Sequence, residues 1–105
     1  MFGAVHVSEI PRDVRAQVIE RDHSCCRVCG RYTDTPGLHH IKYRSEGGGH
    51  TPDNLITIGW TPGHDCHISI VHANKALWQP ILQIVVASPA HVTAFAVKRW
   101  QQTRL

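Results

Sequence analysis

The stretch LHHIKYRSEGGGHTPDNL, which runs from Leu38 to Leu55, carries the clearest signals for the fold of this chain. It starts with an apolar residue and a histidine doublet, passes through a glycine-rich segment and ends on an Asn-Leu pair. This order predicts a strand over residues 38–44, a flexible loop over 45–52 and a second, short strand over 54–58. Cysteines lie on both sides of the stretch, so groups that bind metal surround the two strands.

Helical patterns are expected before and after these strands. Val14 and Val18 recur at helical spacing among charged residues, which predicts an amphipathic helix over residues 11–22. A second helix is expected over residues 65–78, and Pro80 is expected to end it, because proline is unfavourable inside a helix.

The C-terminal part of the sequence is less specific. The apolar run over residues 81–87 is compatible with a buried strand or with part of a helix, because periodicity does not separate the two in so short a run. Residues 90–105 have a helical pattern that places Val92, Phe95 and Ala96 on one side. We expect the tryptophans to serve core packing rather than base stacking.

Composition limits the class of protein. A chain of 105 residues is expected to form one domain over residues 1–105 with a small core. Its 42% hydrophobic and 18% charged residues are ordinary for a globular protein and exclude disorder of the whole chain. The net charge of +3 would suit a polyanionic partner, although so small an excess is also common in proteins without one. The predicted fold class is a small α+β domain.

The cysteines and the N-terminal sequence bear on the cellular compartment. No basic stretch precedes an apolar segment at the N-terminus, and no window approaches about 18 apolar residues, so we expect a cytoplasmic protein that does not contact a membrane. The four cysteines could form disulfides in a secreted protein. The Cys26-x-x-Cys29 spacing in a chain with nine histidines favours metal binding instead.

Several short motifs follow one another in a definite order. They are Arg21-Asp22 at the end of the first helix, Cys26-x-x-Cys29-Gly30, His39-His40-Ile41, Gly47-Gly48, Asn54-Leu55 and Cys66-His67. This ordered set resembles the HNH endonuclease family, in particular its small cysteine-bearing members, which are common in bacteriophages. The resemblance covers a core motif over residues 12–72 and leaves residues 80–105 as a C-terminal extension. It implies a β-β-α metal fold that cuts nucleic acid with one divalent cation.

The resemblance also implies roles for individual residues. His40 takes the place of the general base, and His39 stands where a metal-binding Asp or His usually lies. His67 matches the last histidine of the family and is expected to be a second metal ligand. Asn54 is expected to orient the loop or the base through its amide. His72 follows five residues after His67 and is either a third ligand or a plain surface histidine.

These residue types suit phosphodiester hydrolysis without reference to a family. A neutral imidazole can take a proton from water near pH 7, because its ordinary pKa is about 6.5. A cation held by further imidazoles can bind the scissile phosphate and the leaving oxygen. Neighbouring residues on a regular strand face opposite ways, so His39 and His40 can share a site only at a bulge or a strand end.

A second metal centre is expected, and here the sequence departs from the family. The resemblance implies a structural zinc held by Cys26, Cys29 and Cys66, but Gly59 occupies the position expected for another cysteine. His64 is the best substitute, because an imidazole nitrogen can also bind zinc. Two alternatives stay open: the neighbouring Cys25 could replace it, although adjacent thiolates seldom bind one ion, or the site could lack zinc.

Basic residues near the doublet and on the first helix are candidates for binding phosphate. They are Lys42, Arg44, Arg15 and Arg21. Such contacts are independent of base sequence and make binding weaken as salt rises. His50, within the glycine-rich loop, could contact phosphate, but a solvated loop histidine is the favoured interpretation.

Taken together, the sequence predicts a DNA endonuclease of low sequence specificity that makes nicks or double-strand cuts. The active-site ion could be Mg, Mn, Ni or Zn, because imidazole ligands do not select among them strongly. One alternative is a zinc-ribbon-like module that binds nucleic acid without catalysis. Another is an HNH-like domain that acts only with partners, such as phage packaging (terminase-type) proteins. A homodimer is a further option, because two nearby cuts ordinarily need two active sites.

Overall fold

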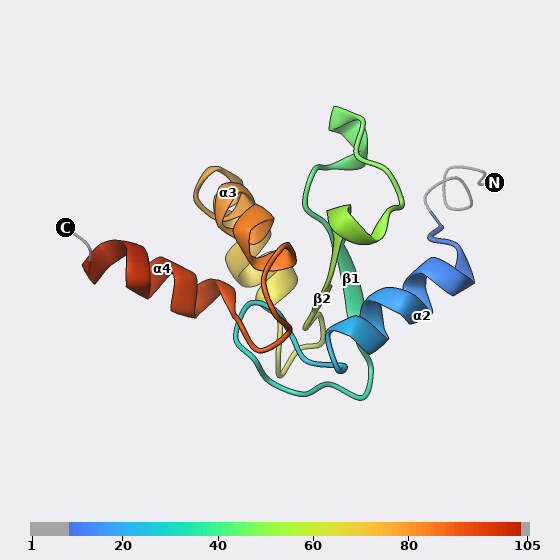
Figure 1. Cartoon of the computed structure of the whole chain (residues 1–105), viewed down its shortest axis with the longest axis horizontal. Helices are drawn as coiled ribbons and strands as arrows, with labels where there is room; N and C mark the ends of the chain where they lie inside the picture. Colours follow the sequence, from blue (N-terminus) through green and yellow to red (C-terminus); the bar gives the residue numbers. More distant parts are fainter. Residues whose placement is uncertain (1–8, 104–105) are drawn as a thin grey trace.

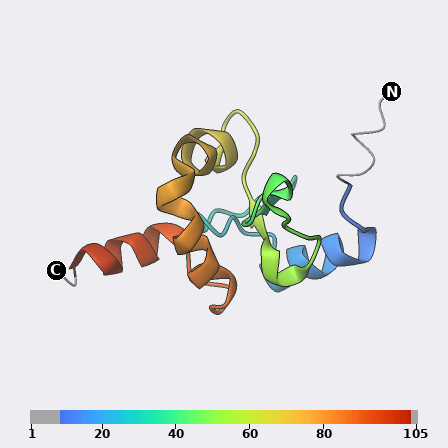
Figure 2. The same ribbon diagram turned by 90° about the horizontal axis from the view of Figure 1, so that it is seen from above.

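Two short antiparallel strands lie between helices at the centre of the molecule. The computed structural model describes residues 9–103, in which α2 (Arg12–Arg21) precedes β1 (Gly37–His40) and β2 (Leu55–Ile58), and α3 (Lys75–Val86) and α4 (Ala94–Thr103) follow. Figures 1 and 2 place α2 on one side of the strand pair and α3 with α4 on the other. The predicted α+β class, with a two-stranded antiparallel sheet, is confirmed.

The strand pair is regular but shorter than expected. Gly37 pairs with Ile58 and His40 with Leu55, without a bulge between them. The first strand was predicted to reach residue 44, and this is wrong. The backbone N–H and C=O of Lys42 are hydrogen-bonded to the side-chain amide of Asn54 and not to a neighbouring strand. The chain therefore leaves the sheet directly after the histidine doublet.

Pro80 does not end a helix, contrary to the expectation. It lies on the exposed side of α3, which continues to Val86, so the apolar run over residues 81–87 is largely helical. The buried face of α3 carries Trp78, Ile81, Leu82 and Val85. A proline inside a helix costs about 3 kcal/mol, whereas each buried apolar side chain contributes about 1.5–3 kcal/mol. Core packing therefore outweighs the local preference of proline.

The last helix also differs from its predicted form. It begins at Ala94 rather than at residue 90, and residues 104–105 lie outside the described part. Ala94 and Val97 face the core, while the side chain of Phe95, expected on the apolar side, is 37% exposed. The first backbone N–H groups of α4 donate to the carbonyl oxygens of Arg27 and Val28, which fixes this helix to the cysteine loop. No helix among residues 9–103 is long and apolar enough to cross a membrane.

A buried ion pair joins the elements around the sheet. The Arg27 guanidinium donates to the Asp22 carboxylate at 2.7 Å, and both side chains are buried. The other Asp22 oxygen accepts from the backbone N–H of Thr57 in β2. Further Arg27 donors reach carbonyl oxygens where α3 leads into α4, namely those of Val85, Ser88, Pro89 and Val92. The pair thus holds α2, β2 and the C-terminal helices in fixed positions.

Candidate metal centres and catalytic site

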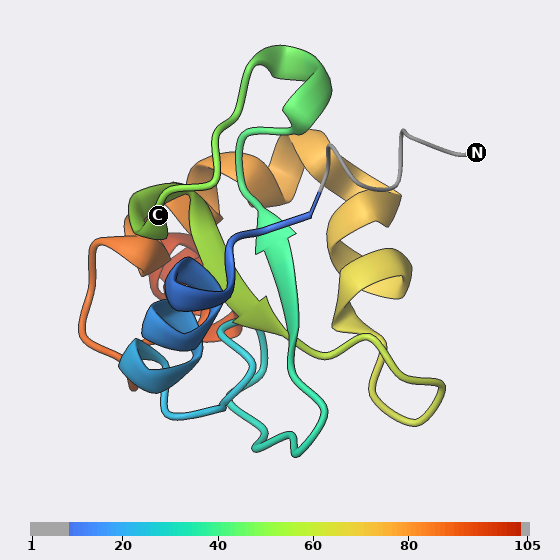
Figure 3. The same ribbon diagram turned by 90° about the vertical axis from the view of Figure 1, so that its right-hand side faces the viewer.

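Three histidines from two parts of the chain meet beside β1. His39 comes from the strand, and His67 and His72 come from the helical segment before α3, which Figure 3 shows next to β1. One ring nitrogen of each lies within 4.8 Å of one ring nitrogen of the others. The Nε2 atoms of His67 and His72 are 3.0 Å apart. We call these three residues the histidine cluster.

A π-helical turn explains the spacing within the histidine cluster. Residues five apart are out of phase on an α-helix, which has about 3.6 residues per turn. Here the segment His67–Val71 is π-helical, and the backbone N–H of His72 donates to the carbonyl oxygen of His67. This wider turn places His72 above His67, since a π-helix bonds residues five apart.

Burial favours the neutral forms of His39 and His67, two members of the histidine cluster. Burial, with the neighbouring imidazoles, lowers the pKa of His39 to about 3. Burial and His72 also lower the pKa of His67, and Asp65 only partly opposes them. Neutral imidazoles offer lone pairs, and metal binding requires deprotonated ligands. The donor set therefore fits a divalent cation.

Tyr43 supports His72 from outside the histidine cluster. Its hydroxyl lies 3.1 Å from Nδ1 of His72, the ring nitrogen that points away from His67. Lys75 lies over the Tyr43 ring, 4.7 Å from its centroid, and forms an ion pair with Glu46. Such partners fix the tautomer and the orientation of a metal-binding histidine. No motif in the sequence indicated this position of Tyr43 beside a candidate metal ligand.

His40 shares an open cavity with the histidine cluster. The cavity has a volume of about 340 Å³ and is lined by Leu38, His39, His40, Tyr43, Arg44, Ser45, His67 and His72. The doublet lies where β1 ends, and the register up to His40 is regular, so the strand end and not a bulge lets both histidines reach one cavity. Burial lowers the pKa of His40, and so do the charges of His50 and Arg44.

His50 is not a solvated loop histidine, contrary to the expectation. Its Nδ1 lies 3.0 Å from Nε2 of His40. Its other ring nitrogen, Nε2, is buried and has no hydrogen-bond partner among the described residues. The sequence contains no local signal for this contact, because the two histidines are ten residues apart and the path of the loop between them is set by contacts with Asn54 and Lys42.

Asn54 ties the glycine-rich loop to the end of β1. Its Oδ1 accepts from the backbone N–H of Lys42, and its Nδ2 donates to the carbonyl oxygens of Lys42 and Gly49. Gly48 fits closely into the same turn, since a Cβ atom there would lie 1.8 Å from the Lys42 oxygen. Asn54 thus contacts the loop, and it does not line the cavity.

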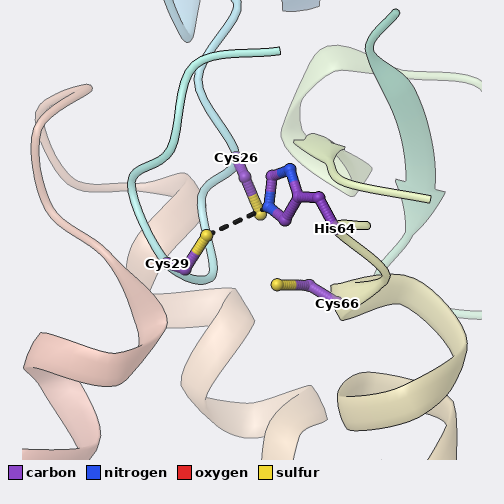
Figure 4. A group of neighbouring side chains, drawn as sticks. All are labelled: Cys26, Cys29, His64 and Cys66. Atoms are coloured by element: carbon purple, nitrogen blue, oxygen red, sulfur yellow. Dashed lines mark hydrogen bonds between the residues drawn. The ribbon is translucent and has the colours of Figure 1, made fainter. Parts of the chain in front are cut away.

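The second group of potential ligands combines three thiols and an imidazole. Cys26, Cys29, His64 and Cys66 offer ligand atoms within 4.8 Å of one another, and Figure 4 shows these side chains pointing toward a common centre. Nε2 of His64 lies 3.1 Å from Sγ of Cys29. All four cysteines of the chain are free, and Cys25 is outside the group. This donor set is compatible with a structural zinc. We call it the Cys3His group.

The three thiols of the Cys3His group differ in acidity, and Cys26 is the one that favours the thiolate form. A hydrogen bond from Cys66 lowers the pKa of Cys26 to about 4. The same hydrogen bond, with burial, raises the pKa of Cys66, and burial raises the pKa of Cys29. The Cys26 thiolate therefore lies beside two neutral thiols, those of Cys29 and Cys66. A divalent cation would stabilise the charge of further thiolates.

The candidate phosphate-binding residues differ in how many hydrogen bonds their charged groups already make within the fold. Arg44 lines the cavity and donates to the carbonyl oxygen of Gly48, and Lys42 is exposed beside it. Arg15 is exposed, with one nitrogen bonded to the oxygen of Pro36. The Arg21 guanidinium instead donates to Asp22 and to backbone oxygens within the fold. These hydrogen bonds join α2 to the sheet, so the Arg21 guanidinium serves the fold rather than a phosphate contact.

Comparison with known families agrees with the motifs. Residues 26–61 match the family model described as HNH endonuclease. The resemblance inferred from the sequence is thereby confirmed for this segment, which contains the Cys26-x-x-Cys29 loop, the histidine doublet and Asn54. The segment ends before His64, Cys66 and the two histidines of the π-helical turn. No curated protein matches the chain. The match supports nuclease chemistry, and the metal-binding groups are those described above.

Proposed function

We propose that the protein is a metal-dependent endonuclease that hydrolyses DNA phosphodiester bonds. The observation that carries the proposal is the juxtaposition of the histidine cluster and His40 on one open cavity. The match to HNH endonuclease supports nucleic acid as the substrate class. His39, His67 and His72 would hold the divalent cation, and His40 is the general base.

Hydrolysis of the phosphodiester would use water, His40 and the cation held by the histidine cluster. The oxygen of a water molecule forms a bond to phosphorus while His40 accepts its proton, and the bond from phosphorus to the leaving oxygen breaks. The leaving oxygen takes a proton from solvent, which completes the hydrolysis to a phosphomonoester and an alcohol. When bound, the cation would supply positive charge to the phosphate and to the leaving oxygen. His40 is suited to its role because its lowered pKa keeps it neutral near pH 7.

Positive side chains near the cavity support DNA as the substrate. Arg44 is at the rim of the cavity and Lys42 is exposed next to it, so both can reach phosphates that flank the scissile bond. Arg15, on α2, would contact the backbone further away. Contacts of this kind do not read base identity, so we propose low sequence specificity.

The Cys3His group would hold a structural zinc. Three sulfurs and one imidazole nitrogen are a usual ligand set of structural zinc, and four protein ligands would leave no position for water or substrate. In a small domain such an ion contributes on the order of 10 kcal/mol to folding. We also propose that residues 1–105 form one domain, with the core motif over 12–72 and a helical C-terminal extension.

Cleavage of supercoiled plasmid tests the proposal. The protein, treated with a chelator mild enough to leave zinc in the Cys3His group, receives Mg, Mn, Ni or Zn in separate reactions. His40→Ala tests the base, and His91→Ala, at an exposed histidine away from the cavity, is the matched control. We expect at least one ion to restore nicking in the wild type and the control but not in His40→Ala.

The same assay separates the alternatives. Binding of DNA without cleavage under any ion would contradict the proposal and favour the zinc-ribbon-like module. Cleavage that arises only when a partner protein is added would favour an HNH-like domain that depends on packaging proteins. Retention of activity by folded His40→Ala would contradict the assignment of the base.

A further inference from the structure

We propose that His50 is a positioning residue that holds His40 in the orientation and tautomer needed to accept a proton from water. This inference rests on the proposed function and deepens it, because it names a residue that prepares the general base. It starts from the contact between Nε2 of His40 and Nδ1 of His50, which are 3.0 Å apart. The ring centroids are 5.1 Å apart and the ring planes are tilted by 52°.

The contact leaves one ring nitrogen of His40 for the chemistry. Nε2 of His40 is engaged by His50, whereas Nδ1 has no hydrogen-bond partner among the described residues. The His40 side chain lines the cavity that contains the histidine cluster. Nδ1 is therefore the nitrogen that would take the proton of the attacking water.

The tautomer decides whether Nδ1 can act in this way. A neutral imidazole carries one proton, so one nitrogen donates and the other accepts. If Nε2–H of His40 donates to Nδ1 of His50, the lone pair of His40 is on Nδ1 and is available to water. If His50 donates instead, the His40 proton is on Nδ1, and that nitrogen cannot act as a base.

One ring nitrogen of His50 is buried, which indicates that the surrounding structure holds the ring in this position. Its Nε2 is buried without a hydrogen-bond partner in the described part of the chain. Buried polar atoms are usually paired, and an unpaired one is destabilising, so a loop histidine would ordinarily turn toward solvent. Here the ring stays against His40, although a solvated position would satisfy both of its nitrogens.

The glycine-rich loop is built to hold His50 there. The residue directly before it, Gly49, is tied by its carbonyl oxygen to the Asn54 amide. Gly47 has a φ of +88°, which favours glycine, and Gly48 passes too close to the Lys42 oxygen for any side chain. Arg44 also donates to the oxygen of Gly48. The glycines and Asn54 thus fix the loop whose end places His50 over the base.

Imidazole ¹⁵N NMR at pH 8 tests the proposal without requiring activity. The protein with zinc in the Cys3His group is compared with His50→Ala and His50→Asn, and the His40 signals are assigned by their loss in His40→Ala. We expect His40 in the wild type to be protonated on Nε2 only, and His50→Ala to show a mixture of tautomers. A wild-type His40 protonated on Nδ1, or an unchanged tautomer in folded His50→Ala, would overturn the proposal.

Cleavage kinetics give a second readout. His50→Ala should lower kcat about 10- to 100-fold, a part of what a general base contributes, with KM and the required metal concentration unchanged, since His50 is outside the histidine cluster. His50→Asn should recover much of kcat, because its amide oxygen can accept from His40 near the position of Nδ1. Full activity of His50→Ala while His40→Ala is inactive would overturn this inference alone. Absence of cleavage by the wild type would count against the proposed function, and NMR would still decide the role of His50.

Discussion

The imidazole of His64 lies against the α-carbon of Gly59, in the space that a side chain at that position would need. A Cβ atom built on Gly59 would be 2.5 Å from Nε2 and from Cε1 of His64. The family resemblance places a cysteine at position 59, and here a histidine five residues later fills that space and reaches the same group of sulfurs. The absence of a side chain at Gly59 therefore leaves the space that the His64 imidazole occupies.

Gly59→Ala should displace His64 and weaken zinc binding. The added methyl group overlaps the imidazole, so the ring must move away from Cys29, Cys26 and Cys66. Zinc content measured by mass spectrometry and the thermal unfolding temperature should both decrease. Gly63→Ala is the matched control, because a Cβ atom there meets no atom within 4 Å. Full zinc content and unchanged Tm in Gly59→Ala would show that His64 is not needed for the ion.

The double variant Gly59→Cys with His64→Ala should bind zinc again. Removal of the imidazole vacates the space above residue 59, and a thiol placed there completes a set of four cysteines. We expect His64→Ala alone to bind zinc more weakly than the double variant. Competition with a coloured zinc chelator measures the difference. Equal affinity of the two variants would mean that position 59 does not face the ion.

Tyr43→Phe should weaken metal binding at the histidine cluster by about 10-fold or more, as expected when the partner of a ligand is lost. The hydroxyl that holds Nδ1 of His72 is removed, while the ring under Lys75 remains. Calorimetric titration with Mn²⁺ gives the affinity. Tyr32→Phe, at a side chain that is 66% exposed, controls for loss of a hydroxyl elsewhere. Identical affinities for all three proteins would remove Tyr43 from the metal site.

Acid should destabilise the fold through His39. Its pKa is about 3 in the folded protein and about 6.5 in an unfolded chain. Between these values the unfolded chain binds a proton that the folded protein does not, so stability decreases as pH falls from about 6.5 toward 3. The limiting slope for one such group is about 1.4 kcal/mol per pH unit.

Urea unfolding of the wild type and His39→Gln measures this contribution. Both proteins carry the Cys3His group, so its own acid sensitivity cancels in the difference between them. We expect the wild type to lose more stability than His39→Gln when the pH is lowered from 7.5 to 5.5. Parallel losses in the two proteins would mean that His39 takes up a proton as readily in the folded state as in the unfolded chain.

Local sequence patterns predicted much of the fold. The spacing of Val14 and Val18 indicated α2, and the doublet and the Asn54-Leu55 pair marked the two strands to within a few residues. These features depend on neighbours in the chain, which sequence patterns represent directly. The continuation of the helix through Pro80 was not predicted, because burial of Ile81 and Leu82 against distant residues overrides the local preference of proline.

Contacts between distant residues explain what the sequence could not predict in the site. His40 and His50 meet through a loop that Asn54 and its glycines hold in place, and nothing in the spacing of the two histidines indicates this contact. Arg27 and Asp22 were not singled out for the core, since charged residues are rarely fully buried unless paired. The placement of His64 was inferred because one cysteine was missing from an otherwise complete pattern, so a gap in a motif served as the signal.

The most direct test of the account is a titration of plasmid cleavage with Mn²⁺ for the wild type, His67→Ala and His40→Ala. In the proposed site the histidine cluster binds the metal and His40 acts as the base, so His67→Ala should need more Mn²⁺ and approach the wild-type rate at saturation. His40→Ala should reach its maximum at the wild-type concentration of Mn²⁺, with a rate lower by about 100-fold or more. Equal behaviour of the two variants, or full activity of folded His40→Ala, would contradict this division.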